Sequence, residues 1–476
     1  MINSFKKSLI YYIINFLFLF ICLIQNTQKN HIALTISIVI YIIFIFYINE
    51  NDGVTNQIIL SISFSVIYTN LWRWTYLNIP MEIKYLIDVI SIILTLKILF
   101  RFKKYSRCLK DKIVIISLLL IVFSPIISFF NKVDFIDYIM SLRIYIRFLP
   151  MYIILSISKN DYKKHDFYFL CGLNLILVII QSRLGWRDDV SGVFGISNVQ
   201  GFFLFLLIIY CIGLTRYLYN KINLMLFSII SLVIFIISGI GEIKVAFIII
   251  PVISIIGIVL NQRNYIKLFK IGIPIVFMII IGFNILVQIS PNFKSFFSYD
   301  YIGQNIYNYT MRTNDERFYL GRIENIAYTN NYILTSQKDK ITGLGIGYAM
   351  PDENWYYTAD FVPRGRSIIN LYETKLYQEY GLYFGYHFSS MNIIYLEGGI
   401  IGLITFYLII SIQFLRSFKI LKKTNKINYK CLSNASISLL IALVLLMFYY
   451  PYLIDINANL LFIIVMALIT NVYKLE

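Results

Sequence analysis

The chain has 476 residues, of which 59% are hydrophobic and only 14% are charged, and its mean hydropathy is +0.72. A soluble protein of this length could not bury so much apolar surface in one core, so the composition excludes that class and indicates a membrane protein. The formal net charge of +17 would suit nucleic-acid binding. We expect no nucleic-acid partner, because the Lys and Arg residues are spread over short connections where membrane topology accounts for them.

Apolar runs follow one another along almost the whole chain. Runs of ~20 apolar residues match the hydrocarbon thickness of a bilayer, so they predict an all-α polytopic membrane protein with about fourteen spans. The first run follows Lys6 and Lys7 without a small-residue cleavage site, and we expect it to be a retained span. The predicted spans are 9–25, 31–48, 57–71, 83–100, 113–130, 136–157, 167–183, 197–215, 223–240, 243–260, 270–288, 389–415, 433–450 and 452–472.

The basic residues cluster in the gaps that follow even-numbered spans. One cluster runs from Arg101 to Lys112 after the fourth span, and another runs from Arg416 to Lys430 after the twelfth. Because positively charged loops stay in the cytoplasm, even-numbered gaps and both termini are predicted to be cytoplasmic. The gap 49–56 carries no Lys or Arg and departs from this pattern.

One long polar segment, residues 291–386, separates the spans of residues 1–290 from those of residues 387–476. It falls in an odd-numbered gap, so we expect it on the outer face. It is far longer than an ordinary connection. A flippase would not need such a segment, so its presence favours an enzyme that works at one membrane face over a transporter.

Two local patterns stand out within residues 291–386, which are called the outer segment below. The stretch from Glu316 to about Leu334 predicts a helix that begins at Thr313 or Asn314. The stretch Gly343-Leu-Gly-Ile-Gly347 lacks the strand and helix that flank a nucleotide-binding loop. It predicts a tight turn that returns the chain to the membrane.

His387 lies where the outer segment re-enters the membrane, and it is one of three histidines in the chain. An interfacial histidine is the ordinary alternative to a functional one. However, Asn392 and Glu397 follow it within the next span, and polar residues at the end of an apolar helix usually have a function.

Several cations converge with His387 on the outer side. Arg143 and Arg147 lie four residues apart in the sixth predicted span, where they are either deep in the bilayer or, if residues 132–149 lie flat, at its interface. The other candidates are Arg187, Lys244, Arg317 and Arg322. For Arg317, the alternative to a functional role is a position on a solvated helix face. For Lys244, it is a lysine that extends to the membrane interface. Guanidinium groups stabilise charge on phosphate, and a histidine can take a proton from a hydroxyl.

No outward set of His, Asp and Glu side chains has the spacing of metal ligands. Asp188 and Asp189 are adjacent, but they equally suit a turn, and nothing nearby in sequence completes a coordination shell. We therefore expect no metal site and no cofactor.

At these residues the chain resembles the Wzy-type O-antigen and capsule polymerases and the wider O-antigen polymerase/ligase superfamily. The resemblance covers roughly the second half of the chain and the overall topology. It rests on Ser191–Asn198, Ser238–Lys244, Arg322 with Gly343–Gly347, and His387–Leu403, of which the last is the most specific.

The resemblance implies a GT-C-like, metal-independent glycosyltransferase in the bacterial plasma (inner) membrane that uses an undecaprenyl-pyrophosphate-linked glycan. It places the family's histidine on His387 and its outer-loop arginine on Arg322. Lys244 stands where the family has arginine, and Arg187 matches another family arginine with looser spacing.

The expected reaction is polymerisation. The growing glycan would pass from undecaprenyl pyrophosphate to a lipid-linked repeat unit, with membrane lipid, a chain-length regulator and a flippase as partners. A ligase that moves the glycan to lipid A core or another acceptor is the close alternative. A lipid-linked oligosaccharide flippase is the more distant one.

Overall fold

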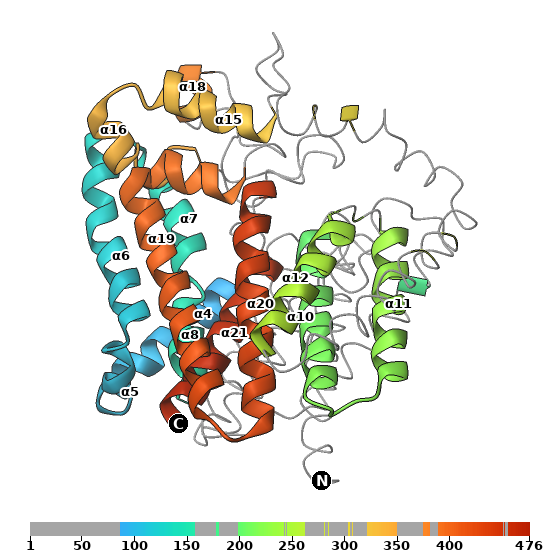
Figure 1. Ribbon diagram of the computed structural model, residues 1–476. Helices are drawn as coiled ribbons and strands as arrows, with labels where there is room; N and C mark the ends of the chain where they lie inside the picture. The colour runs from blue at the N-terminus through green and yellow to red at the C-terminus, as the bar shows by residue number, and fades with distance from the viewer. Residues whose placement is uncertain are drawn as a thin grey trace, which may run out of the picture.

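The computed structural model describes residues 86–157, 199–241, 245–261, 321–349, 375–380, 389–450 and 456–476, together with a few isolated positions (Figure 1). Within these ranges every regular element is helical. The helices are α4 (Leu86–Phe100), α5 (Phe102–Leu109), α6 (Lys112–Phe130), α7 (Phe135–Ile146), α8 (Leu149–Leu155), α10 (Val199–Leu218), α11 (Leu224–Ile240), α12 (Ala246–Asn261), α15 (Arg322–Tyr328), α16 (Gln337–Thr342), α18 (Lys375–Tyr380), α19 (Ser390–Lys423), α20 (Ile427–Tyr449) and α21 (Ile456–Leu475), and a π-helical turn, Thr329–Ile333, follows α15.

Five helical stretches in the described ranges are long and apolar enough to cross a membrane. They are Lys112–Phe130, Phe135–Leu155, Gly201–Leu218, Ser390–Lys423 and Ile427–Tyr449. The chain is therefore a helical membrane protein, as its composition predicts. Helices α4, α11, α12 and α21 coincide with further predicted spans, although their apolar stretches are shorter. The remaining predicted spans lie almost wholly outside the described residues, and the total of fourteen stays a prediction.

Helices α10 and α20 each contact several of the other described helices. Helix α10 contacts α11, α12, α20 and α21, and α20 also contacts α19. The most deeply buried large side chains include Phe202, Phe203, Phe205 and Tyr210 of α10. Figure 1 shows α10, α11 and α12 on one side of α20 and α6, α7 and α19 on the other. Helix α6 exposes apolar side chains such as Leu119, Val122 and Phe123, which suit contact with lipid.

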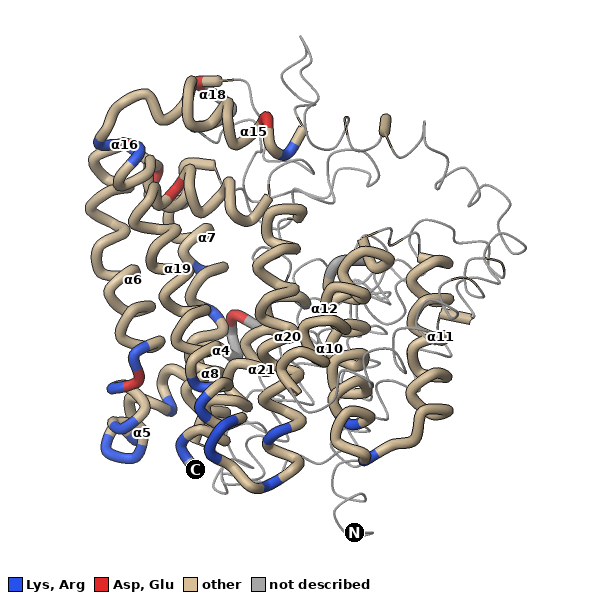
Figure 2. The backbone as a smooth tube through the Cα atoms, viewed as in Figure 1, with Lys and Arg blue, Asp and Glu red and all other residues tan. Residues whose placement is uncertain are grey.

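The two ends of the bundle differ in charge. Figure 2 shows Lys and Arg residues gathered around α5, the connection from α19 to α20 and the end of α21, on the same side as the C-terminus. Helices α15, α16 and α18, which belong to the segment 291–386, lie at the opposite end (Figure 1). The separation agrees with the charge pattern of the sequence. That the basic end faces the cytoplasm stays a prediction.

A buried ionic network joins four helices at the basic end. Arg416 of α19 donates from Nη2 to Asp111, the residue that caps α6, at 2.9 Å. From Nη1 it donates to the hydroxyl groups of Tyr152 in α8, at 3.0 Å, and Thr470 in α21, at 2.9 Å. The Lys474 ammonium lies 3.8 Å from the second Asp111 oxygen. Arg416, which the sequence identifies only as part of a basic cluster, is thus a structural residue.

Helix α19 is bent at Gly399, whose φ of +58° is not helical. The turn Gly343–Gly347 docks into this bend. Backbone N–H groups of Leu344 and Gly345 donate to the carbonyl groups of Leu396 and Glu397, both at 2.9 Å. These bonds hold the outer segment on a membrane helix, which confirms the tight turn predicted from the glycines.

The first residue of this turn needs to be glycine. Gly343 has φ +73°, and a Cβ there would lie 2.4 Å from the carbonyl carbon of Glu397. Gly343→Ala is expected to lower the stability by at least about 1–3 kcal/mol, because the residue would be strained and the turn would have to leave α19. Thermal unfolding of the purified protein in detergent measures this. Gly398→Ala is the control, because its Cβ would meet nothing within 4 Å. Equal stability of the two variants would contradict the docking.

The helix predicted from Glu316 to Leu334 does not run through Gly321. Gly321 has φ −62° and ψ 160°, which is extended, and α15 begins only after it at Arg322. The C-terminal end agrees closely with the end predicted near Leu334, because the π-helical turn ends at Ile333. A continuous helix through Gly321 is therefore wrong, and Arg322 is placed in a first turn and not in a helix interior.

Candidate functional site

Arg322 lies at the junction of three helices at the outer-segment end of the bundle. It is the first residue of α15 and is only 3% exposed. Its guanidinium carbon lies 3.9 Å from the centre of the Tyr449 ring, at the end of α20. Stacking on an aromatic ring orients a guanidinium group. The predicted site residue thus has a defined, buried position.

Helix α15 buries a polar face. Arg322 and Asn325 are each 3% exposed, and Thr329 is fully buried at the start of the π-helical turn. A spacing of three and then four residues places these side chains on one face of a helix. A surface helix ordinarily buries apolar residues, so a buried polar face on α15 was not predicted from the sequence.

The first turn of α19 meets the same junction. Ser390 donates from its backbone N–H and from Oγ to the carbonyl group of Tyr450, at 3.2 and 3.1 Å. The Tyr395 hydroxyl donates to Oδ1 of Asn330 at 2.8 Å. Helices α15, α19 and α20 are therefore tied together where the chain enters α19. Ser389, the N-cap of α19, follows His387 by two residues in the sequence.

Glu397 has a structural role in this region. Its carboxylate is buried and accepts hydrogen bonds from the backbone N–H groups of Gly347, at 3.0 Å, and Ala349, at 3.3 Å. It also accepts one from the Tyr145 hydroxyl at 3.0 Å. A carboxylate that receives these bonds fixes the turn to α19 and α7. The polar residue that the sequence singles out in this span therefore positions other elements.

Tyr348, beside this turn, anchors α18. Its hydroxyl donates to Glu379, and its backbone carbonyl accepts from the N–H of Leu376 at 3.1 Å. Burial, together with the hydrogen bond to Glu379, raises the pKa of the Tyr348 phenol above its ordinary value. The phenol stays protonated at neutral pH and continues to donate this bond.

Arg143 and Arg147 lie inside the candidate span Phe135–Leu155. Both alternatives for these arginines, deep in the bilayer or at its interface, stay predictions. Arg143 forms an ion pair with Asp88 of α4 at 3.3 Å. Arg147 is 2% exposed, and its guanidinium lies 5.0 Å from the centre of the Phe148 ring. Neither of these two contacts involves Arg322.

The other predicted site residues are His387, Arg187, Lys244 and Arg317. All four lie outside the described residues. Their roles stay predictions.

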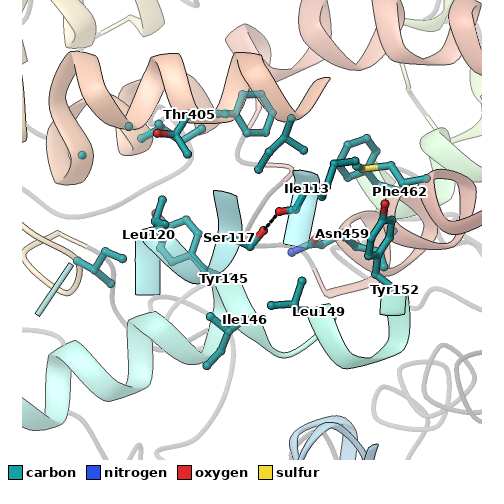
Figure 3. Close-up of a pocket in the computed structure, with 18 residues that line it drawn as sticks. Ile113, Ser117, Leu120, Tyr145, Ile146, Leu149, Tyr152, Thr405, Asn459 and Phe462 are labelled. Carbon is teal, nitrogen blue, oxygen red and sulfur yellow. Dashed lines mark hydrogen bonds between the residues drawn. The ribbon is translucent and has the colours of Figure 1, made fainter. Parts of the chain in front are cut away.

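An apolar groove runs along α19 (Figure 3). It has about 1070 Å³ of empty space, counting the part that opens to the surroundings. Residues of α6, α7, α8, α19 and α21 line it, among them Ile146, Leu149, Ile394, Gly398 and Phe462. A groove with this lining accepts a hydrocarbon chain better than a polar ligand.

The polar groups along the groove mostly bond to the protein itself. Ser117 donates to the carbonyl group of Ile113 at 2.9 Å, a bond drawn in Figure 3. Thr405 donates to the carbonyl group of Ile401 at 2.8 Å, and the Tyr145 hydroxyl donates to Glu397. Because these hydroxyl groups donate their hydrogen bonds to other protein groups, they add little polarity to the groove. The groove was not predicted from the sequence, because helices from separate parts of the chain form it together.

In the described ranges no three His, Cys, Asp or Glu side chains come together as a possible metal site. No protein-family model matches this chain, and no curated protein matches it significantly.

Proposed function

We propose that the protein is a polysaccharide polymerase that transfers a growing glycan from undecaprenyl pyrophosphate to a lipid-linked repeat unit at the outer membrane face. The observation that carries the proposal is the position of Arg322, a buried guanidinium at the point where the outer segment meets the start of α19. In the sequence, His387 lies three residues before the first residue of α19.

The groove along α19 supports a lipid-linked substrate. A pyrophosphate on a polyprenyl chain needs cationic groups for its head and an apolar surface for its tail. Arg322 supplies a cation at the end of the bundle, and the groove supplies the apolar surface along the same helix that begins there. Ile394, in the second turn of α19, already lines the groove.

The proposed reaction is a displacement at the anomeric carbon of the donor sugar. The acceptor hydroxyl oxygen forms the new glycosidic bond as His387 takes its proton. The bond from the anomeric carbon to the pyrophosphate oxygen breaks, and undecaprenyl pyrophosphate leaves. Arg322, with Arg187 and Lys244, stabilises the charge that develops on it. The configuration inverts if no covalent intermediate forms.

The glycan pattern of cells tests the proposal. Cells without the protein should show single repeat units on their lipid carrier, and restoring the protein should restore a ladder of long chains. A ladder that forms normally without the protein would overturn the proposal. Restored transfer of preformed long chains to an acceptor, with no change in chain length, would mean a ligase instead.

The groove gives a separate prediction. Gly398 lines the groove, and a Cβ there would meet nothing within 4 Å. Gly398→Leu should therefore fill part of the groove, because its Cβ enters open space. We expect the lipid-linked substrate concentration for half-maximal rate to rise about tenfold or more, which corresponds to about 1.4 kcal/mol of lost binding.

Kinetics of the purified protein with lipid-linked repeat units measure this effect. Gly303→Leu is the matched control, because Gly303 also has open space around it and does not line the groove. A half-saturating concentration that is unchanged in Gly398→Leu would show that the tail binds elsewhere.

A further inference from the structure

A buried side-chain amide lies in the first turn of α19. The Asn392 side chain is fully buried, yet neither its Oδ1 nor its Nδ2 has a hydrogen-bond partner among the described residues. Its backbone N–H donates to Ser389 Oγ at 3.2 Å. Buried amides are nearly always hydrogen-bonded, so an orphan of this kind calls for an explanation.

Thr329 is a second orphan. It is fully buried, and its Oγ1 likewise lacks a partner in the described part of the chain. It begins the π-helical turn Thr329–Ile333. A threonine in a regular helix commonly donates to the carbonyl group four residues earlier, and this one does not. Single π-helical turns occur frequently at functional sites.

The two orphans belong to the same contact between elements. Tyr395 of α19 donates to Asn330 of the π-helical turn at 2.8 Å. Asn392 lies three residues before Tyr395, on the same face of α19, and Thr329 directly precedes Asn330. Both orphans therefore lie within three residues of an end of this bond. Thr329 also shares the buried face of α15 with Arg322.

We propose that Asn392 and Thr329 bind a sugar ring of the lipid-linked glycan, beside the pyrophosphate that Arg322 holds. This inference rests on the proposed function. A carboxamide offers two donors and an acceptor, and a hydroxyl group offers a donor and an acceptor, all without charge. These groups match the hydroxyl and acylamino substituents of a sugar. Thr329 lies seven residues from Arg322, about 10 Å along a helix, which is the reach of the first or second sugar.

The alternative is that packing alone leaves both side chains without partners and that neither binds a ligand. An apolar replacement of similar shape distinguishes the two explanations. Asn392→Leu and Thr329→Val remove buried polar atoms without partners, so the thermal stability of the unliganded protein should be unchanged or higher. Activity should fall in the same variants if the side chains bind the sugar. Ser438→Ala is the matched control, because Ser438 is also a fully buried orphan but lies in the middle of α20.

The experiment uses the full chain in nanodiscs and two probes. One probe is the lipid-linked repeat unit from cells that lack the protein, and the other is undecaprenyl pyrophosphate without sugar. Asn392→Leu and Thr329→Val should weaken binding of the repeat unit about tenfold or more and leave binding of the bare pyrophosphate unchanged. Arg322→Ala should weaken both, and Ser438→Ala should weaken neither.

Two outcomes would overturn the inference while the proposed function stands. In the first, the wild type polymerises repeat units and Asn392→Leu binds them as tightly as the wild type does. In the second, Asn392→Leu loses affinity for both probes equally, which would mean that it acts through the phosphate site or the fold. If the wild type binds repeat units but never polymerises them, the proposed function fails and the sugar site remains.

Discussion

Replacing Arg322 by alanine is expected to abolish the glycan ladder in cells that otherwise make it. The guanidinium is buried against Tyr449, so no other side chain can take its place without moving α15 or α20. Removing a group that stabilises charge on the leaving pyrophosphate typically costs ~10²–10³-fold in rate. Arg322→Lys should rescue activity only in part, because an ammonium group cannot make the bidentate phosphate contact of a guanidinium.

The variants must be compared at equal amounts of folded protein, since Arg322 also contacts Tyr449. Tyr449→Phe keeps the aromatic ring under the guanidinium and removes only the hydroxyl group, so it should retain activity. Arg317→Ala is a second useful comparison, because a solvated helix face is the alternative to substrate binding at Arg317. A normal ladder from a folded Arg322→Ala protein would remove Arg322 from the mechanism.

Replacing His387 by alanine is expected to have the largest effect on the reaction. Losing a general base typically costs ~10²–10⁴-fold in rate, and a histidine titrates near the working pH. Inserted protein levels should be unchanged. The control is His165→Ala, since His165 lies in a basic gap that is predicted to be cytoplasmic. The length distribution of the glycan measures both variants. Long chains from His387→Ala would show that another group accepts the proton.

The helices and the outer turn could be predicted from sequence because both depend on local properties. Apolar runs locate α6, α10 and α20 because a membrane helix satisfies its own backbone hydrogen bonds within the run. The glycines at 343 and 347 predict a tight turn because glycine readily adopts positive φ, and both residues do so in the structure. The break at Gly321 was not predicted, because a glycine inside a helical pattern is compatible with either outcome.

The partners of charged residues could not be predicted, because they come from distant parts of the chain. The Arg143 ion pair needs Asp88 of α4, and the Arg416 network needs Asp111. Glu397 is a similar case. Its sequence context suggests chemistry at the membrane surface, yet the backbone N–H groups that it binds belong to a turn some 50 residues earlier. Spacing along the chain does not contain such information.

The bend in α19 links the two halves of the proposed site. The turn at Gly343 and the carboxylate of Glu397 hold this bend, and Figure 1 shows the first turns of α19 lying at an angle to the rest of the helix. The short outer part carries Asn392, and the groove extends along the long part. Under the proposed function, one helix thus presents a polar end to the glycan head and an apolar wall to its lipid.

The most direct test of the proposed function is polymerisation by the purified protein alone. The protein is reconstituted in nanodiscs and supplied with undecaprenyl-pyrophosphate-linked repeat units in a chelating buffer, and the products are separated by size. The wild type is predicted to make glycans of many repeats without added metal and to release undecaprenyl pyrophosphate, while His387→Ala leaves single units. Single units from the wild type, or chains that form only after magnesium or manganese is added, would contradict the proposal.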